Sequence, residues 1–294
     1  MISNKELKLV NIQTYDNIVY NLLGLVNSNN EKTLTFIDDK RFLKKLNENP
    51  NITGVITNKD FTDIILNKKV YIVDDPRYVF FTLQNIVSIT YLKNNQKANI
   101  IDSSSKIHSS AFIESFNVVI GRNTIIEPNV TVFSDVEIGD NCVIRSGAVI
   151  GTEGFEYKKT SKGVLGVKHD GKVIIGNNVN IGSNSTICKG FSYRDTMIGD
   201  DTKIDNLVQI SHCVQIGERC LLPASIMIAG SVTIEDDVWI GPGVSISSQL
   251  KIQSGSSITL GSVVMRNVLK NQIVTGDWAL PHKQFLKKLK NNLK

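Results

Sequence analysis

The sequence has few of the residues that usually build metal centres or disulfide frameworks. Its 294 residues include four histidines and four cysteines, Cys142, Cys188, Cys213 and Cys220, and no two cysteines form a CxxC pair. The closely spaced ligands of a structural zinc site are therefore missing, and we expect no metal. We expect the cysteines to be reduced thiols, mostly small residues in the wall of a core.

Long apolar runs and an excess of charge in the body of the chain are also missing. No run of about 18 apolar residues occurs, so we expect no membrane span. The first residues, MISNKE, lack the charged start and apolar stretch of an export signal, which favours a cytoplasmic protein. The net charge of +5 equals the five lysines of residues 281–294, so the rest is neutral and we expect no nucleic-acid binding.

What the sequence does contain is a six-residue repeat. From position 198 to position 264, every sixth residue is a branched aliphatic, and a second, mostly apolar column lies four residues after these positions. The same step occurs earlier, between positions 101 and 150. A period of six cannot be the face of a helix, whose period is 3.6 residues. It is typical of very short strands joined by sharp bends.

This pattern resembles the hexapeptide-repeat family. The resemblance implies a mainly β fold, a left-handed parallel β-helix with three hexapeptides per coil. We predict this fold over residues 99–266, with insertions near 152–172 and 189–197. Insertions in a solenoid project from one edge and often build a binding site, although a surface loop without function is the alternative.

The two ends of the chain lack the repeat. Residues 1–98 favour a small α/β domain, with strands at 55–56 and 70–73 and a helix that Asp75 caps just before a proline. Residues 267–294 are expected to form a short C-terminal extension ending in a basic amphipathic helix. Its apolar face consists of Phe285, Leu286, Leu289 and Leu293.

One histidine, His212, lies inside the uninterrupted repeat. A lone histidine is more often structural, but two neighbours favour a general base. Asp205, seven residues earlier, falls near the bend before the strand of the histidine, where a carboxylate could fix the imidazole tautomer. Gly230, eighteen residues later, lies directly over His212 if a coil has eighteen residues, about 4.8 Å away. A base beside a free N–H donor suits acyl transfer from a thioester.

The residues around His212 carry a closer resemblance. The segment IDNLVQISHCVQIG at 204–217 looks like the active-site stretch of the bacterial UDP-3-O-acylglucosamine N-acyltransferases, enzymes of lipid A synthesis. IAGS at 228–231 resembles the oxyanion-hole segment of that family, and GTEGF at 151–155 resembles a loop after its early coils. The resemblance implies that His212 is the base, Asp205 its partner and Gly230 the oxyanion donor.

The same resemblance implies partners and substrate-binding residues. The family is a homotrimer with active sites between adjacent prisms, and it needs no metal or tightly bound cofactor. It transfers acyl groups from acyl carrier protein to the amine of a UDP-sugar. Phe36 matches a residue that can stack on a pyrimidine, whereas Asp39, Phe42 and Gln249 replace an asparagine, a tyrosine and a second histidine. The remaining expected substrate-binding residues are Asn206, Gln209, Phe155 and Tyr157, and packing of the loop is the alternative role of the two aromatic residues.

Several functions remain open from the sequence. The leading hypothesis is an N-acyltransferase acting on a dTDP- or UDP-linked amino sugar, with acyl-CoA or acyl carrier protein as donor. It is either a relative serving surface polysaccharide or the lipid A enzyme itself, and the lysines of the tail suit either donor. An O-acyltransferase of the same fold would use the same His212, and a non-catalytic trimeric scaffold is the non-enzyme alternative. Cys213 is expected to point away from His212, so we expect no cysteine nucleophile.

Overall fold

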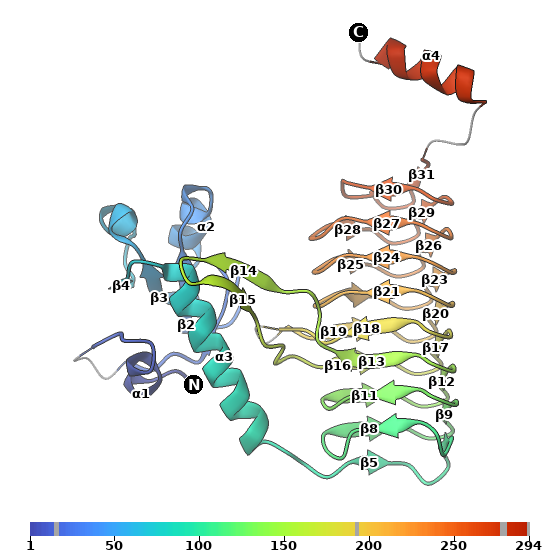
Figure 1. Cartoon of the computed structure of the whole chain (residues 1–294), viewed down its shortest axis with the longest axis horizontal. Coiled ribbons are helices and arrows are strands. Elements are labelled where there is room, and N and C mark those ends of the chain that lie inside the picture. The colour runs from blue at the N-terminus through green and yellow to red at the C-terminus, as the bar shows by residue number, and fades with distance from the viewer. Residues whose placement is uncertain (15–17, 192–193, 277–280, 293–294) are drawn as a thin grey trace.

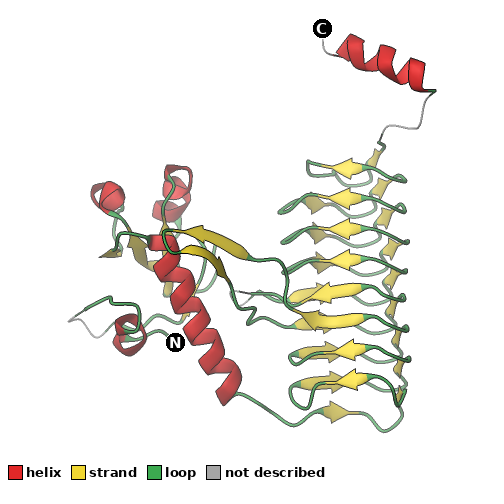
Figure 2. Cartoon of the chain, viewed as in Figure 1, coloured by secondary structure: helices red, strands yellow, loops and turns green. Residues whose placement is uncertain are grey.

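The computed structural model describes residues 1–14, 18–191, 194–276 and 281–292 of the chain. Figure 1 shows a tall stack of coils on one side and a smaller part, made of the N-terminal helices and strands, on the other. Figure 2 shows that strands fill the stack, whereas helices occur in the N-terminal part and at the C-terminal end.

Each coil of the stack has three short strands, and equivalent strands of successive coils pair in parallel to give three sheets. We number these sheets as faces, in the order in which the chain visits them. Face 1 contains β5 (Ile100–Ile101), β8 (Val118–Ile120), β11 (Val136–Ile138), β16 (Val173–Ile175), β19 (Thr196–Ile198), β22 (Gln215–Ile216), β25 (Thr233–Ile234) and β28 (Lys251–Ile252). Face 2 contains β6 (Lys106–Ile107), β9 (Ile125–Ile126), β12 (Val143–Ile144), β17 (Asn180–Ile181), β20 (Lys203–Ile204), β23 (Leu221–Leu222), β26 (Trp239–Ile240), β29 (Ser257–Ile258) and β31 (Ile273–Val274). Face 3 contains β7 (Phe112–Ile113), β10 (Thr131–Val132), β13 (Val149–Thr152), β18 (Thr186–Cys188), β21 (Gln209–Ile210), β24 (Met227–Ile228), β27 (Ser245–Ile246) and β30 (Val263–Val264).

The register of these strands confirms a coil of eighteen residues in the uninterrupted repeat. Ile210 pairs with Ile228, and Ile228 pairs with Ile246. All three side chains are fully buried, so the aliphatic column of the repeat is the core of the stack. Burial of this apolar column drives the folding of the coils. The predicted left-handed parallel β-helix is thereby confirmed.

The stack continues past residue 266, the predicted end of the β-helix. Strand β31 pairs with β29, and Val268 forms a bridge with Ile252. Val274 pairs with Ile258. Both valines thus follow their partners by 16 residues rather than 18, because the last coil is two residues shorter. They leave the six-residue column, and the repeat alone does not reveal them.

The corners of the stack are tight turns in which one residue takes the left-handed conformation. Asparagine, which tolerates that conformation well, occupies it at Asn123 and Asn129, with φ of 56° and 59°. We call the turns leading from face 2 to face 3 the 2–3 corner, and those leading from face 3 to face 1 the 3–1 corner. Both predicted insertions lie at the 3–1 corner, since they follow β13 and β18. Two residues of the second insertion, 192 and 193, lie outside the described residues.

The N-terminal part contains a four-stranded parallel sheet in the order β1-β2-β3-β4, with a long helix packed on it. The predicted cap of that helix is confirmed, because the Asp75 carboxylate accepts a hydrogen bond from the Tyr78 amide at 2.8 Å and Pro76 begins the helix. Its elements are α1 (Asn4–Lys8), β1 (Leu22–Leu23), β2 (Thr33–Ile37), η1 (Lys40–Phe42), α2 (Leu43–Glu48), β3 (Ile52–Thr57), η2 (Lys59–Ile64), β4 (Lys69–Ile72) and α3 (Pro76–Asn94).

The first insertion connects the two parts. It forms an antiparallel hairpin of β14 (Tyr157–Thr160) and β15 (Gly163–Gly166), which reaches from the stack to α3 (Figure 1). Buried residues of the corner, Val167, Phe191 and Cys213, belong to the same apolar cluster as Phe80 and Phe81 of α3. The hairpin and the corner therefore share a core with the N-terminal part.

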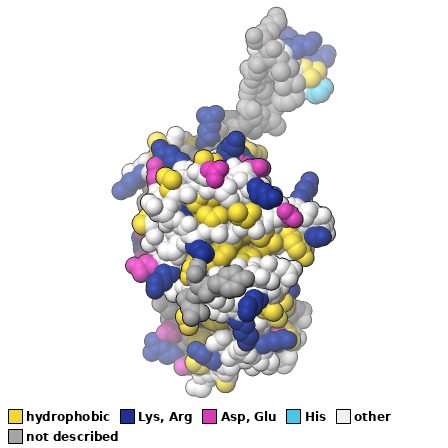
Figure 3. Space-filling view, turned by 90° about the vertical axis from the view of Figure 1, so that its left-hand side faces the viewer, with side chains coloured by type: hydrophobic (Ala, Val, Ile, Leu, Met, Phe, Trp, Pro, Cys, Tyr) yellow, Lys and Arg dark blue, Asp and Glu magenta, His cyan; other side chains and the backbone are white. Residues whose placement is uncertain are grey.

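The predicted C-terminal helix is present as α4 (His282–Asn292), beyond the last coil. Leu293 of its expected apolar face, and the side chains of Phe285 and Leu289, lie outside what the structure describes. Among the residues described, no helix is both long and apolar enough to cross a bilayer. Figure 3, which views the N-terminal side, shows apolar side chains gathered across the middle of that face and Lys and Arg side chains spread around them.

Candidate functional site

The candidate site lies at the 3–1 corner, in the coil that contains His212. His212 follows β21 and precedes β22, so it occupies this corner. Gly230 occupies the same corner one coil later, and the amide of its neighbour Ser231 donates to the His212 carbonyl at 2.9 Å. Both insertions reach the same edge of the stack. The repeat thus stacks the histidine and the glycine, and the insertions surround them.

The imidazole of His212 lies directly against the backbone of Gly230. A Cβ atom added at Gly230 would stand 2.3 Å from Cε1 of His212 and 2.5 Å from Nε2. Any side chain at this position would therefore displace the ring. The Gly230 amide has no acceptor among the described residues, so the position combines a histidine with an unused N–H donor.

The carboxylate nearest to His212 comes from the first insertion, at Glu156. Its Oε2 lies 3.3 Å from Nε2 of His212, and both side chains are largely buried, at 12% and 13% exposure. Nδ1 of His212 is buried without a hydrogen-bond partner. Glu156 also forms an ion pair with Lys158, whose ammonium lies 4.8 Å from the centre of the Phe81 ring.

A second histidine, His169, supports the same loop. The Gly154 amide donates to its Nε2 at 3.2 Å, and its Nδ1 donates to the Val167 carbonyl at 3.2 Å. Its ring centre lies 5.8 Å from that of His212, and Phe191 packs edge-on against both rings. Burial lowers the pKa of His169 to about 4, so its ring is neutral at physiological pH.

The structure corrects the expected contact between Asp205 and His212. Asp205 follows β20 at the 2–3 corner, whereas His212 lies at the 3–1 corner, so one whole side of the coil separates them. The imidazole contacts Glu156 through one nitrogen, and the other has no partner. The physical reason is the repeat itself: a step of seven residues moves the chain to the next corner. Within the chain, the carboxylate beside the histidine is therefore Glu156.

Asn206 and Gln209 are also separated from the 3–1 corner. Asn206 shares the 2–3 corner with Asp205, and its side-chain oxygen accepts from the Ser183 amide at 2.6 Å. Gln209 points outward from β21, and its amide nitrogen lies 3.4 Å from the sulfur of Cys188. These two residues and His212 thus follow one another along face 3.

The other expected substrate-binding residues of the stack do lie at the 3–1 corner. The Gln249 amide donates to the Gly230 carbonyl at 3.1 Å, which places it one coil beyond the glycine. Phe155 is 87% exposed, and its ring centre lies 4.9 Å from that of Tyr157.

The residues expected to hold a nucleotide lie in the N-terminal part. Phe36 packs on Phe80 and Phe81, at ring distances of 4.9 and 5.4 Å. Asp39 accepts two hydrogen bonds from the Arg41 guanidinium, at 2.9 and 2.6 Å, which lower the pKa of its carboxyl. Phe42 is partly exposed beside the same Arg41.

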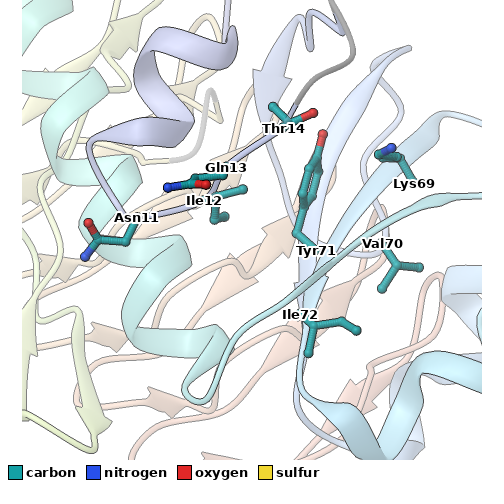
Figure 4. Close-up of a pocket in the computed structure, with 8 residues that line it drawn as sticks. All are labelled: Asn11, Ile12, Gln13, Thr14, Lys69, Val70, Tyr71 and Ile72. Atoms are coloured by element: carbon teal, nitrogen blue, oxygen red, sulfur yellow. The ribbon is translucent and has the colours of Figure 1, made fainter.

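A pocket of about 450 Å³ lies elsewhere in the N-terminal part, between a loop and strand β4 (Figure 4). None of the three expected nucleotide-binding residues lines it. The lining residues are Asn11, Ile12, Gln13, Thr14, Lys69, Val70, Tyr71 and Ile72. The pocket and these three residues are thus separate features of the N-terminal part.

The cysteines at the corner are unsuited to nucleophilic chemistry. Burial raises the pKa of Cys213 to about 11, so its thiol stays protonated. All four cysteines are free and buried, as expected for residues of the core wall. Within the described ranges, no group of three or more potential ligands is arranged to hold a metal ion.

Three parallel sheets and an eighteen-residue coil define a left-handed parallel β-helix, and its six-residue step resembles that of the hexapeptide-repeat proteins. Models of two hexapeptide families match the stack. "Bacterial transferase hexapeptide (six repeats)" matches residues 117–152, and "Hexapeptide repeat of succinyl-transferase" matches 172–206 and 213–248.

Within this class, the chain resembles the UDP-3-O-acylglucosamine N-acyltransferases. It is 47% identical to that of Marinomonas sp. (strain MWYL1) over 75 residues, 26% of this chain and 22% of the relative. It is 28% identical to that of Helicobacter pylori over 190 residues, 56% of this chain and 55% of the relative. These matches span between about a fifth and just over half of the length of the relatives. A solved UDP-N-acetylglucosamine acyltransferase from Campylobacter jejuni matches at 22% identity and a TM-score of 0.49, covering 67% of this chain and 81% of that one.

Two residues of the corner, Glu156 and His169, are absent from the sequence-based predictions. Glu156 stands between the two aromatic residues expected to bind substrate, in a turn just before β14. His169 lies in the insertion, where no repeat fixes its position. Only the folded hairpin brings it to His212.

Proposed function

We propose that this chain is an N-acyltransferase, which moves an acyl group from an acyl thioester to the amine of a nucleotide-linked amino sugar. The observation that carries the proposal is the imidazole of His212 lying on Gly230, whose amide has no acceptor among the described residues. The similarity to relatives named UDP-3-O-acylglucosamine N-acyltransferase supports both the reaction and the acceptor class.

The proposed step is direct attack without an acyl-enzyme. The acceptor amine attacks the thioester carbonyl carbon while His212 removes a proton from its nitrogen. The carbonyl oxygen gains negative charge, and the Gly230 amide donates a hydrogen bond to it. The C–S bond then breaks, and the departing sulfur takes the proton from the imidazolium. The products are an amide and a free thiol, and the histidine is restored.

The N-terminal part, residues 1–98, is proposed to bind the nucleotide through Phe36, Asp39 and Phe42. A half-buried aromatic ring that rests on Phe80 and Phe81 offers a rigid stacking surface for a pyrimidine. Asp39 already has a cationic partner in Arg41, which reduces its repulsion of a diphosphate. Gln249 is proposed to hydrogen-bond the sugar or the acyl group at the 3–1 corner.

The donor is proposed to be acyl-CoA or an acyl carrier protein. Helix α4 is exposed and basic, and its lysines suit the phosphates of the first or the acidic surface of the second. We further propose a cytoplasmic homotrimer, which sedimentation of the full chain would test. A single sedimenting species of monomer mass would overturn the trimer.

The acceptor is tested by calorimetric titration of the full chain with UDP-N-acetylglucosamine and with a dTDP-4-amino-4,6-dideoxyhexose. Tighter binding of the dTDP-sugar supports a role in surface polysaccharide, and tighter binding of the UDP-sugar supports lipid A synthesis. Absence of binding by either sugar contradicts the proposed acceptor class.

Turnover with acyl-CoA and with acyl carrier protein separates the donors, and acylation of a hydroxyl instead of the amine would contradict N-acyl transfer.

A further inference from the structure

The contact between Glu156 and His212 is built into the hairpin. The Val167 amide donates to the Glu156 carbonyl at 2.9 Å, and the Glu156 amide donates to the Gly154 carbonyl at 3.2 Å. His169 in turn accepts from the Gly154 amide. The backbone on both sides of Glu156 is therefore fixed, and its side chain is directed toward the imidazole.

The hairpin itself is anchored on helix α3 by hydrogen bonds at several points. The Asn85 side chain donates to the Gly166 carbonyl and accepts from the Lys168 amide, both at 2.8 Å. The Asp75 carboxylate, which caps the helix, also accepts from the Ser161 amide at 2.6 Å. The position of Glu156 is thus set by the N-terminal part as well as by the stack.

The charged groups around His212 come from the two insertions. Glu156 and Lys158 lie on the hairpin, and Arg194 lies on the second insertion. His169 is neutral at physiological pH, and Cys213 keeps its proton. Burial lowers the pKa of His212, Glu156 acts against that effect, and Lys158 and Arg194 add to it. Glu156 is therefore the anion among these groups that favours a proton on the imidazole.

We propose that Glu156 is the carboxylate that positions His212, a role that Asp205 does not fill within the chain. Its Oε2 lies 3.3 Å from Nε2 of the histidine, within ion-pair distance, and both side chains are largely buried. When His212 takes a proton, the adjacent carboxylate balances the new charge in a buried place. The catalytic consequence rests on the proposed function, whereas the pairing itself does not.

The pairing is tested without substrate, by NMR titration of the full chain labelled with ¹³C and ¹⁵N in its histidines. The four histidines are resolved by comparison with His212→Asn. Glu156→Gln is expected to move the midpoint of the His212 titration to lower pH by about 1 unit or more, since an opposite charge at this range shifts a titration by about 1–3 units.

Two matched variants serve as controls for the titration. Glu153→Gln removes a carboxylate of the same loop that pairs with Lys168 instead, and it is expected to leave the midpoint in place. Glu156→Asp keeps the negative charge. Its His212 titration midpoint is expected to stay close to that of the unaltered protein, even if Glu156→Gln also disturbs the hairpin. The proposal is overturned if Glu156→Gln leaves the midpoint unmoved, or if Asp205→Asn produces the larger displacement.

The activity arm separates this proposal from the proposed function. In an acyl-transfer assay, Glu156→Gln is expected to lower kcat about 10-fold at pH 7 with little change in KM, and Glu156→Asp to recover part of the loss. A displaced midpoint in a protein without acyl-transfer activity supports the pairing and contradicts the proposed function. An unchanged kcat with a displaced midpoint would overturn the catalytic role of Glu156.

Discussion

The 2–3 and 3–1 corners of the stack are made from the same repeat but differ in what they carry. At the 2–3 corner, turn follows turn without interruption, and polar groups are used by the neighbouring coils, as when Asn206 accepts from the Ser183 amide. At the 3–1 corner the chain leaves the stack twice, and the excursions fold back over His212 and Gly230.

This difference shows how a solenoid acquires a site. The repeat satisfies its own backbone groups and buries its own aliphatic column, so a regular corner offers little enclosed space. Among the residues described, the first insertion supplies the buried carboxylate and the second histidine beside His212. The stack sets the spacing between histidine and glycine, and the insertions supply the surroundings.

The largest effect is expected from the histidine itself. His212→Asn removes the proposed base and is expected to lower kcat by about 10²–10⁴-fold, the usual range for general base catalysis, while the fold remains. The matched control is His108→Asn, which alters an exposed histidine of the 2–3 corner bonded to Ser110. Rates of acyl transfer and thermal melting would be measured for both. Equal rates for the two variants would contradict a base at the 3–1 corner.

Glycine residues also have different roles at the two corners. Gly230→Ala would place a methyl group 2.3 Å from the His212 ring, and the displaced ring and amide are expected to lower kcat about 10²-fold. Gly243, at the 2–3 corner, has a φ of +68°, and a methyl group added there would meet no atom within 4 Å. Gly243→Ala is therefore expected to cost about 1 kcal/mol of stability through its backbone alone.

Activity and the free energy of unfolding would be measured for both glycine variants. The comparison fails if Gly243→Ala loses activity as severely as Gly230→Ala does, since that would make the effect a general consequence of weakening the turns.

The stack was predictable from the sequence because each residue of a repeat meets its own counterpart one coil away. The pairing of Ile210 with Ile228, and the stacking of His212 on Gly230, follow from counting alone. The contact of Glu156 with His212 could not be counted, since it depends on a hairpin whose position helix α3 fixes. Asp205 does lie at the bend before β21, as expected, but His212 follows that strand, so the length of the strand separates the two within one chain.

The buried histidine of the 3–1 corner should make stability depend on pH. The folded protein binds a proton on His169 only near pH 4, whereas an unfolded chain binds it near 6.5. Between these values the unfolded state holds more protons, so lowering the pH destabilises the fold, by about 3 kcal/mol in total. Denaturant unfolding at pH 7 and pH 5 would measure this slope, and His169→Gln is expected to flatten it. An unchanged slope in that variant would show that other groups cause the pH dependence.

The smallest expected effect concerns the turns of the 2–3 corner, where serine replaces asparagine at one left-handed position. Ser225 takes the left-handed conformation, with φ of 64°, at a position where Asn129 stands in an earlier coil with φ of 59°. Because asparagine tolerates this conformation better than serine, Ser225→Asn is expected to stabilise the protein by about 0.5 kcal/mol, and Asn129→Ser to destabilise it by a similar amount. Thermal melting of both variants checks this symmetry. If both variants change the stability in the same direction, side-chain contacts and not backbone conformation determine the stability of these turns. The 2–3 corner would then be less uniform in its side-chain contacts than in its backbone.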